Sequence, residues 1–404
     1  MGSSVAVVGG GPAGLMAAEV LASAGAEVTV YERMPSVGRK LQLAGRGGLN
    51  LTHTEALDRF LDRYGPARPR LEAAIRAFGP AELRAWSAGL GQRAVVGTSG
   101  RVFPEAFRST PLLRAWLGRL SELDVAIRTR WTWTGWTANG DLRFTTPEDG
   151  EVAVEPDVVV LALGGASWPR TGSDGGWVAL LAGVGVDVQP LQPANVGFTV
   201  AWSEHFADHF GGTPLKNVAV TAGDAARKGE AMVTARGIEG GVVYALGPHI
   251  RDRVQRDGST TIRLDLRPDL SREELRRRLV TRRPKDSIAN VLRRAAGLTP
   301  VGIGLVREVG GPGIAHAPVD ELVTLIKHLP VVVTGTAGID RAISTAGGIA
   351  LDEVDDRFML RRRPGTFVAG EMLDWEAPTG GYLLQATFST AVAAARGARD
   401  WLDR

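Results

Sequence analysis

The sequence predicts an α/β protein whose main domain is built on a buried parallel sheet. Residues 5–8 form a short apolar run ended by glycine, which is typical of a strand buried on both faces. Residues 12–24 are mostly helix formers, and residues 27–31 resume a strand, which completes a βαβ unit. A second buried strand at 158–163 is also followed by paired glycines, so both strand ends are candidate ligand sites.

Between these strands the pattern indicates a loop, helices and a hairpin. Residues 34–54 are predicted to form a glycine-rich loop, whereas residues 55–90 and 109–121 have helical periodicity. Residues 125–146 alternate in the manner of strands around an Asn-Gly pair, which is a strong hairpin signal. The chain closes with a helix predicted at 382–398.

A chain of 404 residues exceeds the size at which one core usually stops growing, so two domains are expected. After residue 190 the pattern is β-rich through Tyr244 and then charged and helical. From Ala346 the sequence is again rich in glycine. We therefore predict that one domain is split by an insertion. The predicted domains are residues 1–190 with 344–404, and residues 191–343, of which about 271–328 are mainly helical.

Composition limits the chemistry. The chain has no cysteine, so disulfides, thiolate metal sites and a redox-active dithiol are excluded, and electron transfer must use a bound cofactor. His205 and His209 have helical spacing, but Phe206 stands where a metalloprotease motif requires glutamate, so we predict no metal site. The net charge of +3 is too small to indicate a nucleic-acid partner. With no apolar stretch of about 18 residues and no signal peptide, a cytoplasmic protein is expected.

The turn after the first strand carries a dinucleotide fingerprint. Gly9, Gly11 and Gly14 fit G-x-G-x-x-G between a strand and a helix. The first glycine permits a tight turn, the second lets pyrophosphate approach the backbone, and the third lets the helix pack on the strand. Free amides at the helix start bind phosphate, and Glu32 ends the second strand, where a carboxylate accepts ribose hydroxyls. The pattern predicts a Rossmann-type site for NAD(P) or FAD.

Further glycine clusters favour FAD. An isoalloxazine ring needs a second cradle from remote segments of the chain. At Gly380-Gly381 such a cluster lies where the last helix begins, and a helix N-terminus facing the ring would stabilise the negative charge of the reduced flavin. The four candidate clusters are residues 45–50, 164–165, 369–371 and 379–382.

The motifs Gly38-Arg39-Lys40-Leu41, Gly47 to Thr52 and Thr379 to Gln385, combined with the N-terminal fingerprint, resemble those of the aminoacetone-oxidase-like flavoproteins. That group includes the bile-acid-inducible flavoproteins and is catalogued as NAD(P)/FAD-dependent oxidoreductases. The resemblance covers essentially the whole chain. It implies a glutathione-reductase-like FAD domain, split in the sequence, with an inserted β-barrel-like domain that carries a helical piece.

The fingerprint and the resemblance together define the predicted cofactor site, in which the N-terminal residues face the ADP part and the later ones face the ribityl chain and ring. The chain has no second G-x-G-x-x-G, so NAD(P)H is expected to bind only transiently, over the ring. The predicted cofactor-binding residues are Gly9, Gly11, Pro12, Ala13, Gly14, Glu32, Arg33, Lys40, Gly45, Arg46, Gly47, Asn50, Thr52, Ala162, Gly164, Gly165, Gly370, Glu371, Gly380, Gly381, Tyr382 and Leu383.

One motif departs from the family pattern. Where the family has Ser-Gly-Gly-Gly-Arg-Cys-Asn, this chain has Ala-Gly-Arg-Gly-Gly-Leu-Asn at residues 44–50, so Gly48 and Leu49 replace the arginine and cysteine, and Arg46 is new. The substrate therefore stays open. Arg46, Tyr382 and Arg101 are candidate substrate contacts, and no catalytic residue is assigned.

We expect an FAD-dependent oxidoreductase that transfers a hydride between a small organic substrate or NAD(P)H and the flavin. Two alternatives stay open. One is a flavin-dependent RNA-modifying protein, whose basic segment 272–283 would bind phosphates with a steep salt dependence. The other is a non-enzymatic flavin-binding protein.

Overall fold

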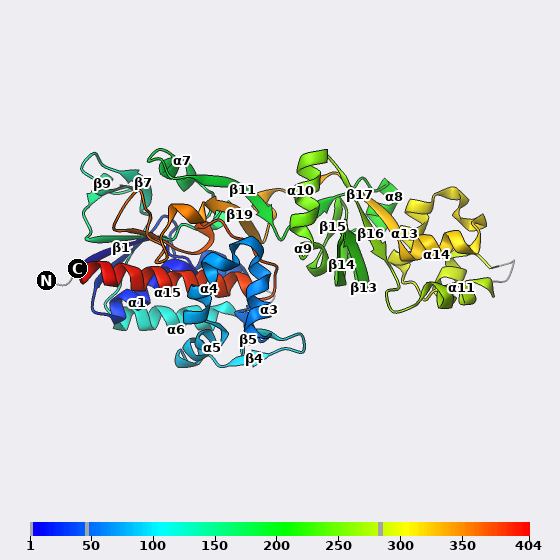
Figure 1. The fold of residues 1–404 in the computed structure, drawn as a ribbon, viewed down its shortest axis with the longest axis horizontal. Coiled ribbons are helices and arrows are strands. Elements are labelled where there is room, and N and C mark those ends of the chain that lie inside the picture. The colour runs from blue at the N-terminus through cyan, green and yellow to red at the C-terminus, as the bar shows by residue number, and fades with distance from the viewer. Residues whose placement is uncertain (1–2, 45–47, 282–285) are drawn as a thin grey trace. The chain divides into compact units, whose positions relative to one another are not determined.

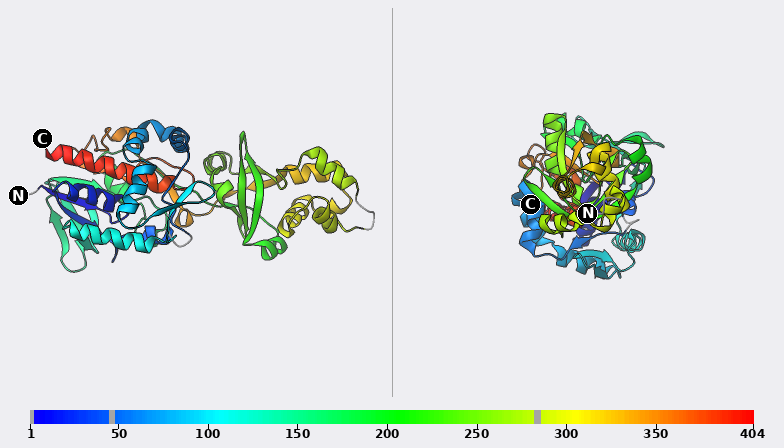
Figure 2. Two further views of the ribbon diagram at one scale, coloured as in Figure 1. Left: turned by 90° about the horizontal axis from the view of Figure 1, so that it is seen from below. Right: turned by 90° about the vertical axis from the view of Figure 1, so that its right-hand side faces the viewer.

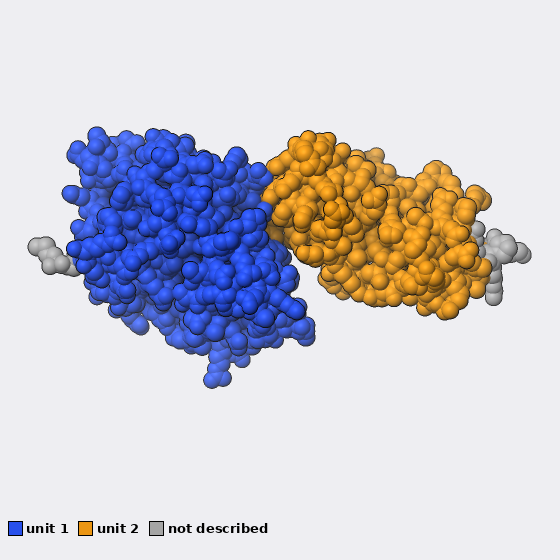
Figure 3. Space-filling model, viewed as in Figure 1, with its two compact units in different colours: residues 1–192, 343–404 blue, residues 193–342 orange. Residues whose placement is uncertain are grey.

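The computed structural model describes residues 3–44, 48–281 and 286–404. The chain divides into two compact units, which we call unit 1 and unit 2 (Figure 3). Unit 1 comprises residues 1–192 and 343–404, and unit 2 comprises residues 193–342. The predicted site residues Gly45, Arg46 and Gly47 lie outside the described residues.

Unit 1 is built on a five-stranded parallel sheet with the order β20-β10-β1-β2-β6. The central strand β1 pairs with β10 on one side and with β2 on the other, so Val5 lies opposite both Val158 and Val28. The predicted α/β class with a Rossmann-type unit is confirmed. The five strands are β1 (Ser4–Val8), β2 (Glu27–Glu32), β6 (Ala126–Thr129), β10 (Val158–Leu161) and β20 (Thr366–Val368).

Two helices that are remote in the sequence lie side by side on the sheet: α1 (Pro12–Ser23) and α15 (Tyr382–Leu402) (Figures 1 and 2). The closing helix runs four residues beyond its predicted end. Beside them Trp116 of α6 packs against Phe388 of α15 with ring centroids 5.7 Å apart. The other helices of unit 1 are α2 (Arg39–Ala44), α3 (Leu57–Leu61), α4 (Arg68–Ala77), α5 (Pro80–Gly89), α6 (Ser109–Glu122) and α7 (Trp177–Ala182).

The prediction of a loop over residues 34–54 was wrong in two parts, because α2 occupies its middle and the short strand β3 (Thr52–His53) lies near its end. The six residues of α2 are good helix formers, and the glycines that surround them obscured this pattern. Gly38, at φ +70°, reverses the chain just before the helix, and the Gln42 amide donates to its carbonyl. Leu41 is buried and anchors the helix in the core.

Three small sheets complete unit 1, and the two that have three strands are antiparallel. The Asn139-Gly140 hairpin is confirmed, since β7 and β8 pair in antiparallel fashion around it. These sheets contain β7 (Thr132–Trp136), β8 (Leu142–Thr146) and β9 (Gly150–Val154); β3 (Thr52–His53), β5 (Arg101–Pro104) and β4 (Ala94–Val96); and β11 (Val188–Ala194) with β19 (Ser344–Ile349).

Unit 2 contains a seven-stranded sheet with the order β17-β16-β13-β14-β15-β12-β18. Its two outermost strands are joined by the single residue Thr334, so the sheet must curve back on itself. The strands are β12 (Phe198–Thr199), β13 (Thr213–Ala222), β14 (Ala225–Thr234), β15 (Gly237–Glu239), β16 (Thr260–Asp265), β17 (Leu329–Val333) and β18 (Gly335–Thr336).

The helices of unit 2 include four consecutive ones between residues 272 and 327. The segment predicted as β-rich also contains α8 and, at its end, the short helix α9. Ser203 caps α8 by accepting from the Phe206 amide, and Phe206 is buried. No helix in the described part of the chain is both long and apolar enough to cross a membrane. The helices are α8 (Glu204–Phe210), α9 (Gly241–Tyr244), α10 (Gly247–Asp257), α11 (Arg272–Val280), α12 (Ile288–Arg294), α13 (Pro300–Gly310) and α14 (Val319–Lys327).

Substitution of Gly14 by alanine should destabilise unit 1, because the new Cβ would stand 1.8 Å from the Gly9 carbonyl oxygen. We expect the free energy of unfolding to fall by about 3 kcal/mol, a typical cost of overpacking. Gly118→Ala is the matched control, since Gly118 is an exposed helical residue whose added Cβ would meet nothing within 4 Å. It should raise stability by about 0.5–1 kcal/mol. Urea unfolding of the apoprotein measures both, and equal effects would contradict the close packing.

Candidate functional site

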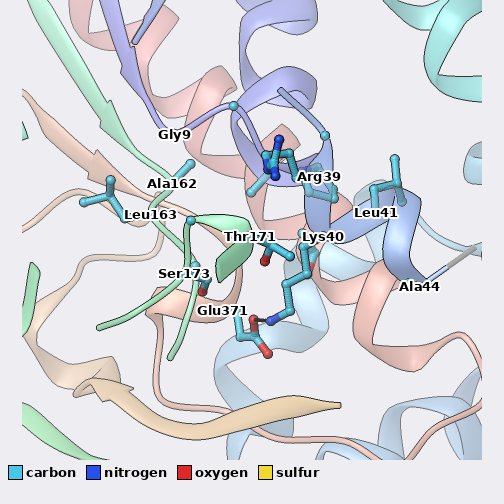
Figure 4. A pocket seen from close by; sticks show the side chains of 18 of the residues that line it. Gly9, Arg39, Lys40, Leu41, Ala44, Ala162, Leu163, Thr171, Ser173 and Glu371 are labelled. Atoms are coloured by element: carbon cyan, nitrogen blue, oxygen red, sulfur yellow. Dashed lines mark hydrogen bonds and ion pairs between the residues drawn. The ribbon is translucent and has the colours of Figure 1, made fainter. Parts of the chain in front are cut away.

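A pocket of about 660 Å³ lies in unit 1 at the carboxyl ends of the parallel strands β1, β2 and β10 (Figure 4). In open α/β sheets this is the edge where ligands bind, because loops from neighbouring strands diverge there. All residues that line the pocket belong to unit 1. The pocket has two ends with different chemistry, which we call the glutamate end, around Glu32, and the helix end, around the start of α15.

The glycine turn after β1 forms one wall of the pocket. Gly9, at φ +109°, touches the next strand so closely that a Cβ would meet the Ala162 carbonyl oxygen at 2.3 Å. Gly11 is different, because a Cβ there would meet no protein atom within 4 Å. Gly11, Pro12 and Ala13 line the pocket, and no side chain caps the N-terminus of α1. The free amides of this helix can therefore bind an anion.

Glu32 stands beside the glycine turn. Its Oε2 accepts from the Gly10 amide at 2.8 Å, and its Oε1 accepts from the Met34 amide at 2.7 Å. Burial raises the pKa of the Glu32 carboxyl above its ordinary value, although these two amides oppose the shift. Each carboxylate oxygen retains a second lone pair, so the fixed side chain can still accept from ligand hydroxyls. The neighbouring Arg33 pairs with Asp174 at 2.7 Å, and both residues line the pocket.

Aromatic side chains form the wall beyond Glu32. Trp131, Trp133 and Trp177 line the pocket, and Trp131 packs on Tyr31 with ring centroids 5.2 Å apart. The Trp133 Nε1 is buried and has no hydrogen-bond partner within the described ranges. Sequence reasoning missed these residues, because the alternation around Trp131 and Trp133 indicated only strands and no motif included Trp177. An aromatic wall with a free donor suits a heteroaromatic base.

The second glycine turn, after β10, contributes Ala162 and Gly164 to the pocket. Gly164, at φ +72°, is held by Trp177, whose Nε1 donates to its carbonyl at 2.8 Å. Gly165 does not line the pocket. A Cβ there would meet the Thr345 hydroxyl at 2.3 Å, so this glycine serves the packing of two loops.

At the opposite end, α15 directs its N-terminus towards the pocket. Gly380, Gly381 and Leu383 line it, and no side chain caps the helix. Gly381, at φ +97°, lies against β3, where a Cβ would stand 2.5 Å from the backbone of Thr52. Only glycine allows the start of this 21-residue helix to come so close to β3.

Five predicted site residues that the structure describes do not line the pocket: Gly14, Thr52, Gly165, Gly370 and Tyr382. They hold its walls together. The Thr52 hydroxyl donates to Gln385 at 2.7 Å in the core, and the Gly370 amide donates to Thr390 at 3.0 Å. The Tyr382 hydroxyl donates to Glu55 at 2.5 Å, and its ring stacks on His53 instead of facing the pocket.

The middle of the pocket contains charged and unpaired polar groups. The Lys40 Nζ donates to Glu371 Oε2 at 2.6 Å and to the Ser167 hydroxyl at 2.7 Å. Asn50 Oδ1 and Arg39 Nε are buried and have no hydrogen-bond partner among the residues described. Both side chains line the pocket. Buried polar atoms without partners are rare, so their presence in a pocket indicates a polar ligand.

These features fit FAD in particular. A dinucleotide could place its pyrophosphate at the glycine turn, its adenosine at the glutamate end, and its ring at the helix end. The buried atoms of Asn50, Arg39 and Trp133 that have no partner would then lie along the length of the dinucleotide. The residues described contain no cluster of three or more histidine, aspartate or glutamate side chains that could hold a metal ion.

Residues 3–397 match the family described as HI0933-like protein Rossmann domain. The chain belongs to this family. It is an FAD-dependent oxidoreductase, and the predicted family resemblance is confirmed.

Two curated relatives match this HI0933-like chain along nearly their whole length. It is 28% identical over 412 residues to the 3-dehydro-bile acid delta(4,6)-reductase of Clostridium scindens, with 98% of this chain and 99% of the relative covered. It is 23% identical over 398 residues to the ribosomal RNA dihydrouridine synthase of Haemophilus influenzae, with 96% of each chain covered.

Among solved structures, the HI0933-like chain is similar to the 3-ketosteroid delta1-dehydrogenase of Sterolibacterium denitrificans in complex with 1,4-androstadiene-3,17-dione. The TM-score is 0.56 at 13% sequence identity, and 99% of each chain is covered. At this identity the likeness concerns the fold alone.

Substitution of Gly11 by valine should remove FAD without unfolding the protein. Gly11 has φ −82° and open space around its Cα, so the fold can accommodate a side chain at this position. The same side chain would occupy the space that the pyrophosphate needs. We expect no flavin in the purified variant and an unfolding free energy of the apoprotein within about 1 kcal/mol of wild type. Gly118→Val serves as the control and should retain flavin. Full flavin content in Gly11→Val, measured by absorbance after heat release, would show that the site lies elsewhere.

The affinity for FAD should depend on pH through Glu32. The ionised carboxyl accepts hydroxyls and the protonated one does so poorly, and the raised pKa brings protonation to a pH above the ordinary value of about 4.3. Flavin affinity should therefore fall as the pH is lowered towards the raised pKa of Glu32. Glu32→Gln should bind about tenfold more weakly at neutral pH and show a flatter profile. Flavin fluorescence titrations of the apoprotein test this, and identical slopes for both proteins would contradict it.

Proposed function

We propose that this protein is an FAD-dependent reductase that adds two hydrogens across a C=C bond conjugated to a carbonyl group, in an apolar, ring-shaped small molecule. The names of two relatives support this reaction type. One denotes a reductase of an oxidised bile acid and the other the formation of dihydrouridine, and both are reductions of a ring C=C bond. The observation that carries the substrate class is the apolar mouth of the pocket at its helix end.

When bound, FAD supplies the reversible acceptance and donation of a hydride. The residues that would hold it are those of the glycine turn for the pyrophosphate, Glu32 for the ribose, and Asn50 with the start of α15 for the ring. The two glycines before α15 bring its free amides to the pocket edge. There they would stabilise negative charge on a reduced ring.

The mouth of the pocket presents two stacked phenylalanines. Phe103 lines the pocket, and Phe107 stacks on it with ring centroids 5.4 Å apart. Phe107 is 52% exposed and has φ +53°, a conformation that costs energy for a bulky residue. An exposed aromatic held under strain beside a pocket indicates a binding role, so we assign these rings to the apolar face of the substrate.

Arg101 adds a charge to this apolar mouth. It lines the pocket, and within the described segments its side chain forms no ion pair or hydrogen bond. An exposed guanidinium beside two aromatic rings suits a substrate that combines a hydrophobic ring system with a carboxylate or carbonyl oxygen. Arg101 is one of the substrate contacts expected from the sequence.

We propose NAD(P)H as the source of the hydride. It would bind transiently over the flavin ring, because the chain has a single dinucleotide fingerprint, which FAD would occupy. The overall reaction is then unsaturated carbonyl compound plus NAD(P)H plus a proton, giving the saturated compound and NAD(P)⁺. We further propose that unit 2 takes part in substrate selection and that the protein acts in the cytoplasm.

A second candidate function is the modification of RNA, since one relative is named a ribosomal RNA dihydrouridine synthase. The basic segment of α11 offers less free charge than its sequence indicates. Arg276 pairs with Asp320, and Arg277 and Arg278 both pair with Glu274. Paired arginines attract phosphates weakly, so we favour the small-molecule substrate.

The two candidates can be separated by reoxidation of the reduced protein. Wild type bleached anaerobically with NADPH or NADH should regain its yellow colour with an unsaturated 3-oxosteroid acid and not with uridine-containing ribosomal RNA. Recovery with RNA alone would establish the second candidate. Recovery with oxygen alone would indicate an oxidase, and bleaching with a primary amine would indicate that an amine is the hydride donor.

Phe107→Ser should raise KM for the steroid acid about tenfold or more, because a phenylalanine ring buried against a ligand contributes about 1.5–3 kcal/mol. Flavin content should not change, since Phe107 lies at the mouth beside Phe103. Val280→Ser is the control, because Val280 is an exposed apolar residue of unit 2. An unchanged KM in Phe107→Ser would remove this ring from the substrate site.

A further inference from the structure

The ion pair of Lys40 and Glu371 joins two walls of the pocket. Lys40 belongs to α2, whereas Glu371 follows β20 near the end of the chain, and Figure 4 shows the two side chains meeting across the pocket. Their side chains are 26% and 16% exposed, and both residues line the pocket. Neither charge is used in the reaction as described above.

The pair is held in place by buried neighbours. Ser167 is fully buried and accepts from Lys40 at 2.7 Å. Glu371 uses its other oxygen to accept from the Thr345 amide at 2.9 Å, and the Thr345 hydroxyl accepts from the Ala166 amide at 2.9 Å. The lysine and glutamate are therefore fixed by three separate segments of the chain, which makes their charges stationary with respect to the pocket.

The two charged groups differ in how many hydrogen bonds they can still form with a ligand. The ammonium of Lys40 has three N–H donors, of which Ser167 and Glu371 take two. Both oxygens of Glu371 already accept a protein hydrogen, one from Lys40 and one from the backbone of Thr345. One donor of Lys40 is thus left for the ligand, while the glutamate is turned to the protein.

The pair lies away from the glycine turn that follows β1. Thr345, which anchors Glu371, follows Ile343 and Ser344, and both of these line the pocket. Figure 4 shows Lys40 and Glu371 on the far side of Ser173 and Thr171 from Gly9. Lys40 and Glu371 are therefore placed to act on the ribityl and ring part of a bound flavin.

We propose that Lys40 and Glu371 set the midpoint potential of the bound flavin, with the lysine cation favouring the reduced ring and the glutamate limiting this effect. Reduction to the anionic form adds negative charge to the ring, which a fixed cation in a partly desolvated site stabilises. A fixed carboxylate acts in the opposite sense. Because the two charges are of opposite sign and separately removable, each has its own measurable effect. The proposal rests on FAD occupying this pocket as proposed above.

The test is a set of midpoint potentials measured by anaerobic dye-coupled reduction, with FAD in excess so that weakened binding does not hide the result. Lys40→Met should bind reduced flavin about tenfold more weakly relative to oxidised flavin, which lowers the potential by about 30 mV for a two-electron couple. Glu371→Gln should shift it by a similar amount in the opposite direction. The double variant should return close to wild type.

Two further variants separate charge from structure. Ser167→Ala removes a hydrogen bond to Lys40 without removing a charge. The ratio of its affinities for reduced and oxidised flavin should therefore differ from the wild-type ratio by less than twofold. Lys40→Arg keeps the charge and should stay near wild type. A structural tie between the walls would instead make Lys40→Met and Glu371→Gln lose flavin together and shift the potential in the same direction or not at all.

That last result, in proteins that bind FAD, overturns the inference and leaves the proposed function untouched. Wild type that binds no FAD overturns the proposed function. Equal loss of affinity for oxidised and reduced flavin in Lys40→Met would place the lysine at the phosphates instead of the ring and would also overturn the inference.

Discussion

The close approach of helix α1 to the end of strand β1 is the constraint on which the rest of unit 1 depends. The Gly9 carbonyl and the Gly14 Cα touch, so that an added Cβ would stand 1.8 Å from the oxygen. This contact starts the helix immediately beyond the sheet and leaves its first amides free. An anion site therefore results from packing, before any side chain takes part.

A second close contact completes the pocket from the other end of the chain. Gly381 lets α15 begin against the backbone of Thr52, and the Thr52 hydroxyl then binds Gln385 one turn into the helix. The helix continues across the sheet beside α1, so the two helix starts are fixed in the same layer. The pocket thus has a positive helix end at two points along its length, which suits a ligand with phosphates at one and a reducible ring at the other.

The charged side chains of this pocket are each held by specific partners in the protein. Glu32 is engaged by two backbone amides, Glu371 by Lys40 and Thr345, and Arg33 by Asp174. Glu32, Glu371 and Arg33 each line the pocket and are held in place there by the protein. Such preorganisation avoids rearrangement on binding, since the groups that would meet the ligand are already oriented.

The sequence alone determined the glycine turn, the parallel strands and the start of the last helix, because each depends on local rules: strands need apolar runs, and close backbone contacts need glycine. It also placed Lys40, Asn50 and Glu371 among the site residues through a family resemblance. Only the tertiary structure showed that Tyr382 packs against Glu55 and His53, that Thr52 is a core residue, and that Trp131 and Trp133 line the pocket. The physical reason is that side-chain direction depends on contacts made between segments hundreds of residues apart, such as Glu55 with Tyr382 or Lys40 with Glu371, and no local pattern encodes them.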